Sequence, residues 1–150
     1  MIEKGTRVKM KEWFGSSGLC FNDNGQLLMV LQGKPEEKKL WSIPSGGKEV
    51  DESFEECCLR EMEEETGYLT EIVEEVKEKR VIYDTRNITA EVRYYIVRIV
   101  GGERAIQDPD GLIYDIAWKG LEELKTLKLT YPEDRDFLIQ FIRKHSSKYI

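Results

Sequence analysis

A short acidic segment with helix signals at both ends is the feature that most constrains this chain. Residues 46–68 read GGKEVDESFEECCLREMEEETGY, and nine of these twenty-three residues are acidic. Ser53 followed by Glu56 forms the S-x-x-E pattern of a capping box, and Gly67 is the glycine that commonly follows the last turn of a helix. We therefore predict a helix over residues 54–66.

Three glutamates of this predicted helix lie on or beside its apolar stripe instead of opposite to it. At about 100° per residue, Glu61, Glu64 and Glu65 fall there, whereas the other glutamates of the helix point away. The stripe itself is marked by Phe54, Cys57 and Cys58. Like charges that face inward are costly unless a cation neutralises them, and no run of lysines lies nearby. A divalent metal is the simplest solution, and oxygen ligands favour magnesium or manganese.

A solvated acidic helix is the alternative interpretation, and two neighbouring features argue against it. Residues 45–47, Ser-Gly-Gly, form a glycine-rich loop whose backbone can approach a metal or a phosphate closely. Arg60 lies beside the glutamates and can pair with Glu52 or Glu56, which would hold the loop against the helix.

The segment resembles the Nudix box, whose pattern is G-x5-E-x7-R-E-U-x-E-E-x-G-U, where U is a bulky apolar residue. The matching positions are Gly46, Glu52, Arg60, Glu61, Met62, Glu64, Glu65, Gly67 and Tyr68. Tyr68 is a mild departure, because the last position of the pattern is more often aliphatic. Every charged position and every glycine of the pattern is filled.

The resemblance implies an α+β fold, an α/β/α sandwich with a mixed β-sheet and the Nudix loop-helix-loop, in one domain over residues 1–150. It also implies a Mg²⁺-dependent hydrolase, in which Mn²⁺ can substitute. The expected reaction is hydrolysis of the pyrophosphate linkage in a nucleoside diphosphate linked to another group, X, by a metal-activated water. A non-catalytic nucleotide-sensing module and an RNA 5′-end pyrophosphohydrolase are the alternatives.

Residue roles follow from the resemblance position by position. Glu61, Glu64, Glu65 and the carbonyl of Gly46 would hold the metal. Glu61 and Glu64 are also assigned to catalysis, and Glu61 is an alternative candidate for orienting or deprotonating the attacking water.

The resemblance also implies residues that hold the loop of the site in place and residues that contact the substrate. Arg60 and Glu52 are assigned to catalysis as partners that hold the loop in place. The candidates for substrate binding are Tyr83, Asp108 and Asp110, for which a strand tyrosine and turn-forming aspartates are the alternatives. Base stacking could come from other aromatic residues, although core packing is the preferred role for each: Trp13, Phe14, Trp41 and Tyr95.

The flanking segments predict a β-rich scaffold and a C-terminal helix. Strands are predicted at residues 7–10, 14–21, 26–31, 40–43, 71–83, 90–100 and 113–118. The Asn-Gly turn within residues 22–25 predicts a β-hairpin between the two strands beside it. The last helix is predicted to begin at Thr130, with Glu133 completing a second capping box.

Composition limits the classes of partner and site. The net charge of −6 over 150 residues argues against broad binding to nucleic acid, so a small nucleotide is the expected partner. No stretch approaches the ~20 apolar residues of a membrane span, and the first residues lack a signal-peptide core, so we expect a cytoplasmic protein. A homodimer is left open. With His145 as the single histidine, neither a histidine-based zinc site nor a Ser-His-Asp triad is supported.

Overall fold

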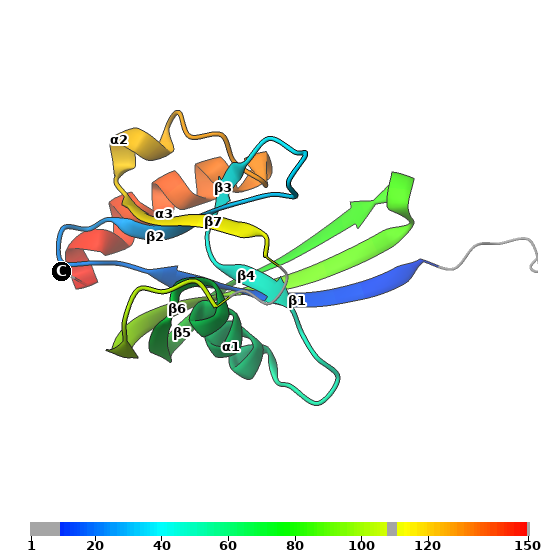
Figure 1. Cartoon of the computed structure of the whole chain (residues 1–150), viewed down its shortest axis with the longest axis horizontal. Coiled ribbons are helices and arrows are strands. Elements are labelled where there is room, and N and C mark those ends of the chain that lie inside the picture. Colours follow the sequence, from blue (N-terminus) through cyan, green and yellow to red (C-terminus); the bar gives the residue numbers. More distant parts are fainter. Residues whose placement is uncertain (1–9, 108–110, 150) are drawn as a thin grey trace, which may run out of the picture.

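A computed structural model describes residues 10–107 and 111–149 of the chain (Figure 1). In chain order, with η for a 3₁₀ helix, the elements are β1 (Lys11–Cys20), β2 (Leu27–Gln32), β3 (Leu40–Ser42), β4 (Ser45–Gly47), α1 (Phe54–Thr66), β5 (Tyr68–Tyr83), η2 (Asp84–Arg86), β6 (Ile88–Gly102), β7 (Ile113–Lys119), α2 (Leu121–Leu124), η3 (Pro132–Asp134) and α3 (Arg135–Tyr149). The strands lie between α1 on one side and α2 with α3 on the other (Figure 1). The predicted α+β sandwich is confirmed.

The strands divide into two sheets. The larger sheet has the order β4-β1-β6-β5 and is mixed, because β1 and β6 are parallel while the other two pairs are antiparallel. The smaller sheet, β3-β2-β7, is antiparallel. The leading strand predicted at residues 7–10 falls, apart from residue 10, outside the described residues.

The predicted hairpin between β1 and β2 is wrong, although its turn forms. The Asn22 side chain accepts a hydrogen bond from the backbone N–H of Gln26 at 2.9 Å, and Gly25 has a φ of 72°. Phe21 and Leu27, which lie on either side of the turn, form an isolated antiparallel bridge. Beyond that bridge the strands separate, because β1 pairs with β4 and β6 on its two edges and β2 pairs with β3 and β7.

Helix α1 has the predicted bounds and caps. The Ser53 hydroxyl accepts from the backbone N–H of Glu56 at 3.0 Å, and the Glu56 carboxylate accepts from the N–H of Ser53 at 2.9 Å. Gly67 ends the helix with a φ of 83°, in the left-handed region that glycine adopts readily. Glu56 is therefore committed to the cap.

Two hydrophobic cores lie on opposite faces of the strand layer. On β6, Tyr94 belongs to the core beneath α3, and its neighbour Tyr95 belongs to the core beneath α1. Helix α1 approaches the larger sheet closely at Gly18, where a Cβ would lie 2.6 Å from the sulfur of Met62. This contact sets the position of α1, and with it the position of its glutamates.

The predicted start of the C-terminal helix at Thr130 is wrong. The backbone N–H of Thr130 donates to the carbonyl of Trp41 at 2.9 Å, so this residue lies against the edge strand β3. A 3₁₀ turn follows, and α3 begins at Arg135. The second capping box does not form, because the Glu133 carboxylate instead faces Lys79 on β5. No helix within the described ranges is both long and apolar enough to cross a membrane.

Candidate active site

The glycine-rich segment before α1 forms the short strand β4, where a loop was expected. Gly46 has no room for a side chain, since a Cβ there would lie 2.1 Å from Cδ of Glu61 and 2.2 Å from its Oε2. The Glu61 carboxylate therefore lies directly against the backbone of β4. The carbonyl of Gly46 accepts a hydrogen bond from the thiol of Cys57 at 3.5 Å. Close approach, and not an unusual backbone angle, is the reason for a glycine here.

Arg60 connects β4 with three glutamates. Its guanidinium donates to both carboxylate oxygens of Glu52, with Nη2 at 2.9 Å from Oε1. Nη1 donates to Glu61 Oε2 at 2.9 Å and to Glu64 Oε1 at 3.3 Å. Nη2 also donates to the carbonyl of Gly47 at 2.9 Å. The hydrogen bond with Arg60 is the main cause that lowers the pKa of Glu52, and it raises the pKa of the guanidinium.

The remaining inward glutamate lies deeper in the molecule. Glu65 is 7% exposed, and its Oε1 accepts from the backbone N–H of Ser45 at 3.3 Å. Burial raises the pKa of Glu61, and hydrogen bonds with Glu65 and Arg60 offset this only in part. The helix glutamates therefore divide by orientation as predicted, and those that point away are exposed: Glu55, Glu56 and Glu63.

We call Glu52, Glu61, Glu64 and Glu65, together with Arg60, the glutamate cluster. Four carboxylates and one guanidinium give a formal charge of −4 + 1 = −3. Arg60, which the sequence places beside these glutamates, neutralises part of their charge. Among the described residues, no three acidic, histidine or cysteine side chains already converge as ligands. The excess negative charge and the oxygen donors nevertheless fit a divalent ion such as Mg²⁺ or Mn²⁺.

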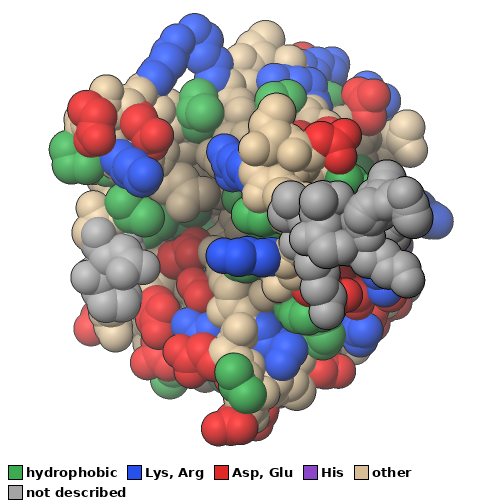
Figure 2. Space-filling model, turned by 90° about the vertical axis from the view of Figure 1, so that its right-hand side faces the viewer, with side chains coloured by type: hydrophobic (Ala, Val, Ile, Leu, Met, Phe, Trp, Pro, Cys, Tyr) green, Lys and Arg blue, Asp and Glu red, His purple; other side chains and the backbone are tan. Residues whose placement is uncertain are grey.

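A cavity of about 510 Å³ opens beside the glutamate cluster, on the face of the larger sheet opposite to α1. Figure 2 shows a hollow near the middle of this side of the molecule, with acidic side chains gathered below it. Ser45 joins the two regions, because it lines the cavity while its backbone N–H donates to Glu65. A ligand in the cavity could therefore reach the cluster.

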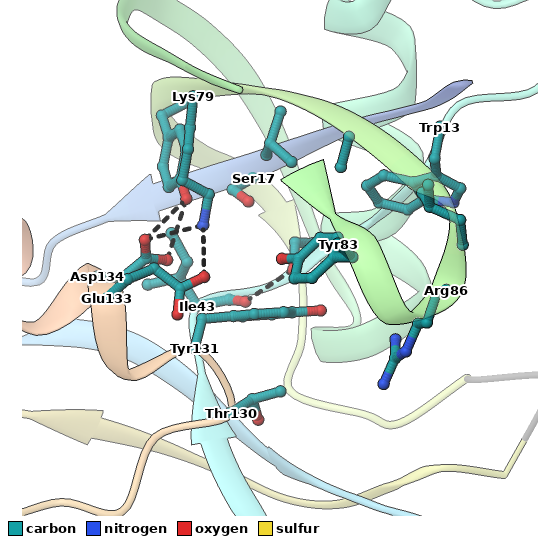
Figure 3. A pocket seen from close by; sticks show the side chains of 15 residues that line it. Trp13, Ser17, Ile43, Lys79, Tyr83, Arg86, Thr130, Tyr131, Glu133 and Asp134 are labelled. Carbon is teal, nitrogen blue, oxygen red and sulfur yellow. Dashed lines mark hydrogen bonds and ion pairs between the residues drawn. The ribbon is translucent and has the colours of Figure 1, made fainter. Parts of the chain in front are cut away.

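Aromatic side chains line much of the cavity (Figure 3). Trp13 and Tyr131 are 41% and 38% exposed, and Tyr83 lies across from Tyr131. The Trp13 ring covers Gly15, where a Cβ would lie 2.4 Å from Cη2. The preferred core role is therefore wrong for Trp13, whereas Tyr95 is 1% exposed and does pack in a core as expected.

One end of the cavity is polar, and we call its three charged residues, Lys79, Glu133 and Asp134, the acidic wall. Lys79 Nζ lies 3.0 Å from Asp134 Oδ1 and 3.5 Å from Glu133 Oε2. The hydroxyl of Tyr94 donates to Asp134, at 3.1 Å from Oδ1 and 3.0 Å from Oδ2. Burial is the main cause that raises the pKa of Tyr94, and the charge of Asp134 adds to it. Arg86 lies at the other end of the cavity (Figure 3).

The predicted substrate contacts have different outcomes. Tyr83 lines the cavity. Asp108 and Asp110 lie outside the described residues, although Gln107 before them donates its backbone N–H to the carbonyl of Glu64 at 2.9 Å. Sequence reasoning missed the acidic wall, because it assigned Glu133 to a helix cap. No local pattern marks Lys79, which comes from a strand far from η3 in the chain.

Sequence comparison relates this chain to one family. The family model described as the NUDIX domain matches residues 14–141. A putative mutator protein MutT4 from Mycobacterium tuberculosis is 33% identical over 100 residues, which cover 64% of this chain and 38% of that protein. An ADP-ribose pyrophosphatase from Bacillus subtilis is 47% identical over 51 residues, which cover 33% of this chain and 28% of that protein. The matched part is thus well under half of either relative.

Structural comparison gives the same fold. A NUDIX hydrolase from Nitrosomonas europaea superposes with a TM-score of 0.75, covering 93% of this chain and 90% of that chain at 18% identity. At this identity the likeness concerns the fold alone.

Proposed function

Because this chain belongs to the Nudix family, we propose that it hydrolyses the pyrophosphate linkage of a small nucleotide, a nucleoside diphosphate linked to a second group. The observation that carries the proposal is the glutamate cluster, with its formal charge of −3, beside a cavity of about 510 Å³. This volume is within the range of small-molecule sites, about 300–1,000 Å³.

The glutamate cluster supplies the oxygen donors that the reaction needs. Glu61, Glu64 and Glu65 would hold Mg²⁺, or Mn²⁺ in its place, with the Gly46 carbonyl as a further donor. A divalent ion bound there neutralises phosphate charge and lowers the pKa of a coordinated water. Arg60 keeps Glu61 and Glu64 in place through Nη1.

The other members of the cluster position these donors. Glu52 fixes the guanidinium of Arg60, which in turn donates to the Gly47 carbonyl of β4. Glu61 would orient the attacking water or accept its proton, and the position of its carboxylate against β4 supports this role. The chemistry is therefore mostly positioning and charge neutralisation, as phosphoryl transfer requires.

The nucleoside would lie in the cavity, with its base against aromatic rings. Trp13 and Tyr131 offer partly exposed faces, on which a base can stack. Ser45 lies where the cavity meets the glutamate cluster, so the phosphates of such a ligand would lie toward Glu65. Tyr83 is proposed as a further contact.

A panel of nucleotides with and without Mg²⁺ tests this proposal. It would include nucleoside triphosphates, nucleoside diphosphate sugars, dinucleoside polyphosphates and a triphosphorylated RNA, with release of phosphate or mononucleotide as the readout. We expect metal-dependent turnover of at least one small nucleotide. Absence of turnover on every phosphoanhydride, combined with tight ligand binding, would favour the nucleotide-sensing module instead.

The RNA arm of the panel addresses the third alternative. The net charge of −6 argues against it, because nucleic-acid affinity comes mainly from basic side chains that neutralise phosphates. Faster turnover of the RNA end than of free nucleotides would establish that alternative. The cytoplasmic location and the homodimer stay predictions.

A further inference from the structure

Two serine side chains lie side by side on the floor of the cavity. Ser17 of β1 pairs with Ser45 of β4 in the larger sheet, and both residues line the cavity. Residues that oppose each other in an antiparallel pair project to the same face, with Cβ atoms roughly 4.5–5.5 Å apart. We call these two residues the serine pair. Their hydroxyls can therefore contact one small group of a ligand.

The hydroxyl of Ser17 is available to such a ligand. Ser17 is 4% exposed, yet no group within residues 10–107 and 111–149 forms a hydrogen bond with its side chain. Figure 3 shows this side chain among those that line the cavity, and no dashed line joins it to a neighbour. Buried hydroxyls are normally hydrogen-bonded, because an unpaired one costs free energy. A ligand that offers an acceptor would supply the missing partner.

The hydroxyl of Ser45 is only weakly engaged. It donates to the carbonyl of Ile43 at 3.4 Å, whereas O–H···O hydrogen bonds usually span about 2.5–3.0 Å. An anionic oxygen can compete for this proton, because hydrogen bonds to charged acceptors are shorter and stronger than those to neutral ones. Both hydroxyls of the serine pair therefore lack a good acceptor within the protein.

The rest of this floor is covered by the Trp13 ring. A Cβ at Gly15 would lie 2.4 Å from Cη2 of the ring, and a Cβ at Gly47 would lie 3.2 Å from Nε1. Gly15 and Gly47 are the next pair along the same two strands. Neither glycine lines the cavity, whereas both serines do. A ligand therefore meets these two strands at the serine pair.

The serine pair also lies next to the glutamate cluster. The backbone N–H of Ser45 donates to Glu65 Oε1 at 3.3 Å, so the pair stands at the boundary between the cavity and the carboxylates. A nucleotide that lies in the cavity and is hydrolysed at the cluster must place a phosphate at this boundary. Hydroxyls suit that position, because uncharged donors can bind a phosphate without pairing with the glutamates that hold the ion.

From this arrangement we infer that the serine pair binds the phosphate next to the nucleoside. The inference rests on the proposed function and adds two substrate-binding residues to it. Each hydroxyl would donate its O–H to a non-bridging oxygen of that phosphate. The contact would fix one end of the pyrophosphate linkage beside the glutamate cluster, whatever the group X is.

Binding of nucleoside monophosphates tests the inference, because these ligands carry the phosphate but have no pyrophosphate linkage to cleave. Dissociation constants would be measured by calorimetry in the presence of Mg²⁺ for AMP, GMP, CMP and UMP and for the corresponding nucleosides. The base whose monophosphate binds most tightly is then used for all variants. We define the phosphate ratio as the dissociation constant of the nucleoside divided by that of the monophosphate.

Removing the hydroxyls should reduce the phosphate ratio. We expect Ser17→Ala and Ser45→Ala each to lower it roughly 10-fold, the loss of one hydrogen bond to a charged group. The affinity for the nucleoside should not change, and its retention also shows that the variants are folded.

Ser42→Ala is the matched control. Ser42 is 5% exposed, but its hydroxyl accepts from the side chain of Gln32 at 2.7 Å, and it does not line this cavity. Its phosphate ratio should equal that of the unaltered protein.

An unchanged phosphate ratio in both serine variants would overturn the inference, as would failure of every monophosphate to bind more tightly than its nucleoside. Parallel losses of nucleoside and monophosphate affinity would also overturn it, because they would place the hydroxyls against the sugar or the base. A reduced ratio in only one variant would contradict the pair and leave a single hydroxyl contact.

The outcome is separate from that of the proposed function. A reduced phosphate ratio without hydrolysis of any nucleotide would leave the inference standing. Hydrolysis with an unchanged ratio would leave only the proposed function.

Discussion

The glutamate cluster and the acidic wall both gather carboxylates around one cation, but they leave different amounts of charge uncompensated. The cluster places four carboxylates around Arg60, whereas the wall places two around Lys79. A formal charge of −3 calls for a further divalent ion. In the wall, whose formal charge is −1, Lys79 pairs with both carboxylates and the hydroxyl of Tyr94 donates to Asp134. The cluster is therefore suited to holding a divalent ion, whereas the ion pairs and the tyrosine hydrogen bond of the wall already compensate most of its charge.

The largest effect should follow from removing a carboxylate of the glutamate cluster. Glu64→Gln or Glu65→Gln should lower kcat by about 100-fold or more, because several kcal/mol of charge stabilisation at the phosphate is lost. Steady-state kinetics on the best nucleotide of the panel would measure this. Glu63→Gln is the matched control on the same helix, since Glu63 is exposed. Unchanged rates in both inward variants would remove these residues from the site.

A methyl group added beneath the cluster should have the next largest effect. In Gly46→Ala the new Cβ would lie 2.1 Å from Glu61 Cδ, so this carboxylate must move. A displacement of about 1 Å at a reacting group can cost roughly 100-fold in rate, and we expect a loss of about 10- to 100-fold in kcat. Gly47→Ala is the control, because the three atoms nearest to its Cβ all belong to the Trp13 ring, at 3.2–3.4 Å, and none to Glu61. Equal losses in both variants would contradict a special role for the contact with Glu61.

Replacing the central cation of the cluster should have a smaller effect. Arg60→Lys keeps the charge but loses the planar group that contacts Glu52, Glu61 and Glu64 together. We expect kcat/KM to fall about 10-fold, with a weaker apparent affinity for Mg²⁺, since partners of metal ligands typically contribute 10- to 100-fold. Titration of activity against Mg²⁺ concentration would measure both. An unchanged Mg²⁺ dependence would mean that positive charge alone suffices.

The smallest effect is expected in the acidic wall and concerns stability. Tyr94→Phe removes the hydroxyl that donates to the buried Asp134, and should lower the free energy of unfolding by about 1–2 kcal/mol. Tyr95→Phe is the control on the other face of β6, because its buried hydroxyl has no hydrogen-bond partner among the described residues. Denaturant unfolding of both variants would measure the difference. Equal destabilisation would show that the hydroxyl of Tyr94 adds nothing specific to the wall.

Several features of the site followed from the sequence because they depend on near neighbours. The caps at Ser53 and Gly67 predicted both ends of α1, since capping hydrogen bonds join residues only three or four apart. Helical periodicity alone placed Glu61 and Glu65 on the inner side. The spacing of the Nudix box also placed Arg60 within reach of Glu52.

Other features could not follow from the sequence because they depend on which strands pair. The Asn-Gly turn after Asn22 predicted a hairpin, but local turn geometry does not decide whether two strands stay in one sheet. The role of Glu133 was misassigned for a related reason. The S/T-x-x-E pattern from Thr130 was present, yet Lys79 on a distant strand competes for the same carboxylate.

The sequence by itself determined the capped acidic helix, its inward glutamates and the family to which the chain belongs. These properties depend on spacing along about twenty residues, and the 3.6-residue helical period carries them directly into space. Tertiary structure alone decided the division into two sheets, the cavity between Trp13 and Tyr131, and the meeting of Lys79 with Asp134. Such contacts join residues more than fifty positions apart, and they exist only once the strands have paired and both cores have packed.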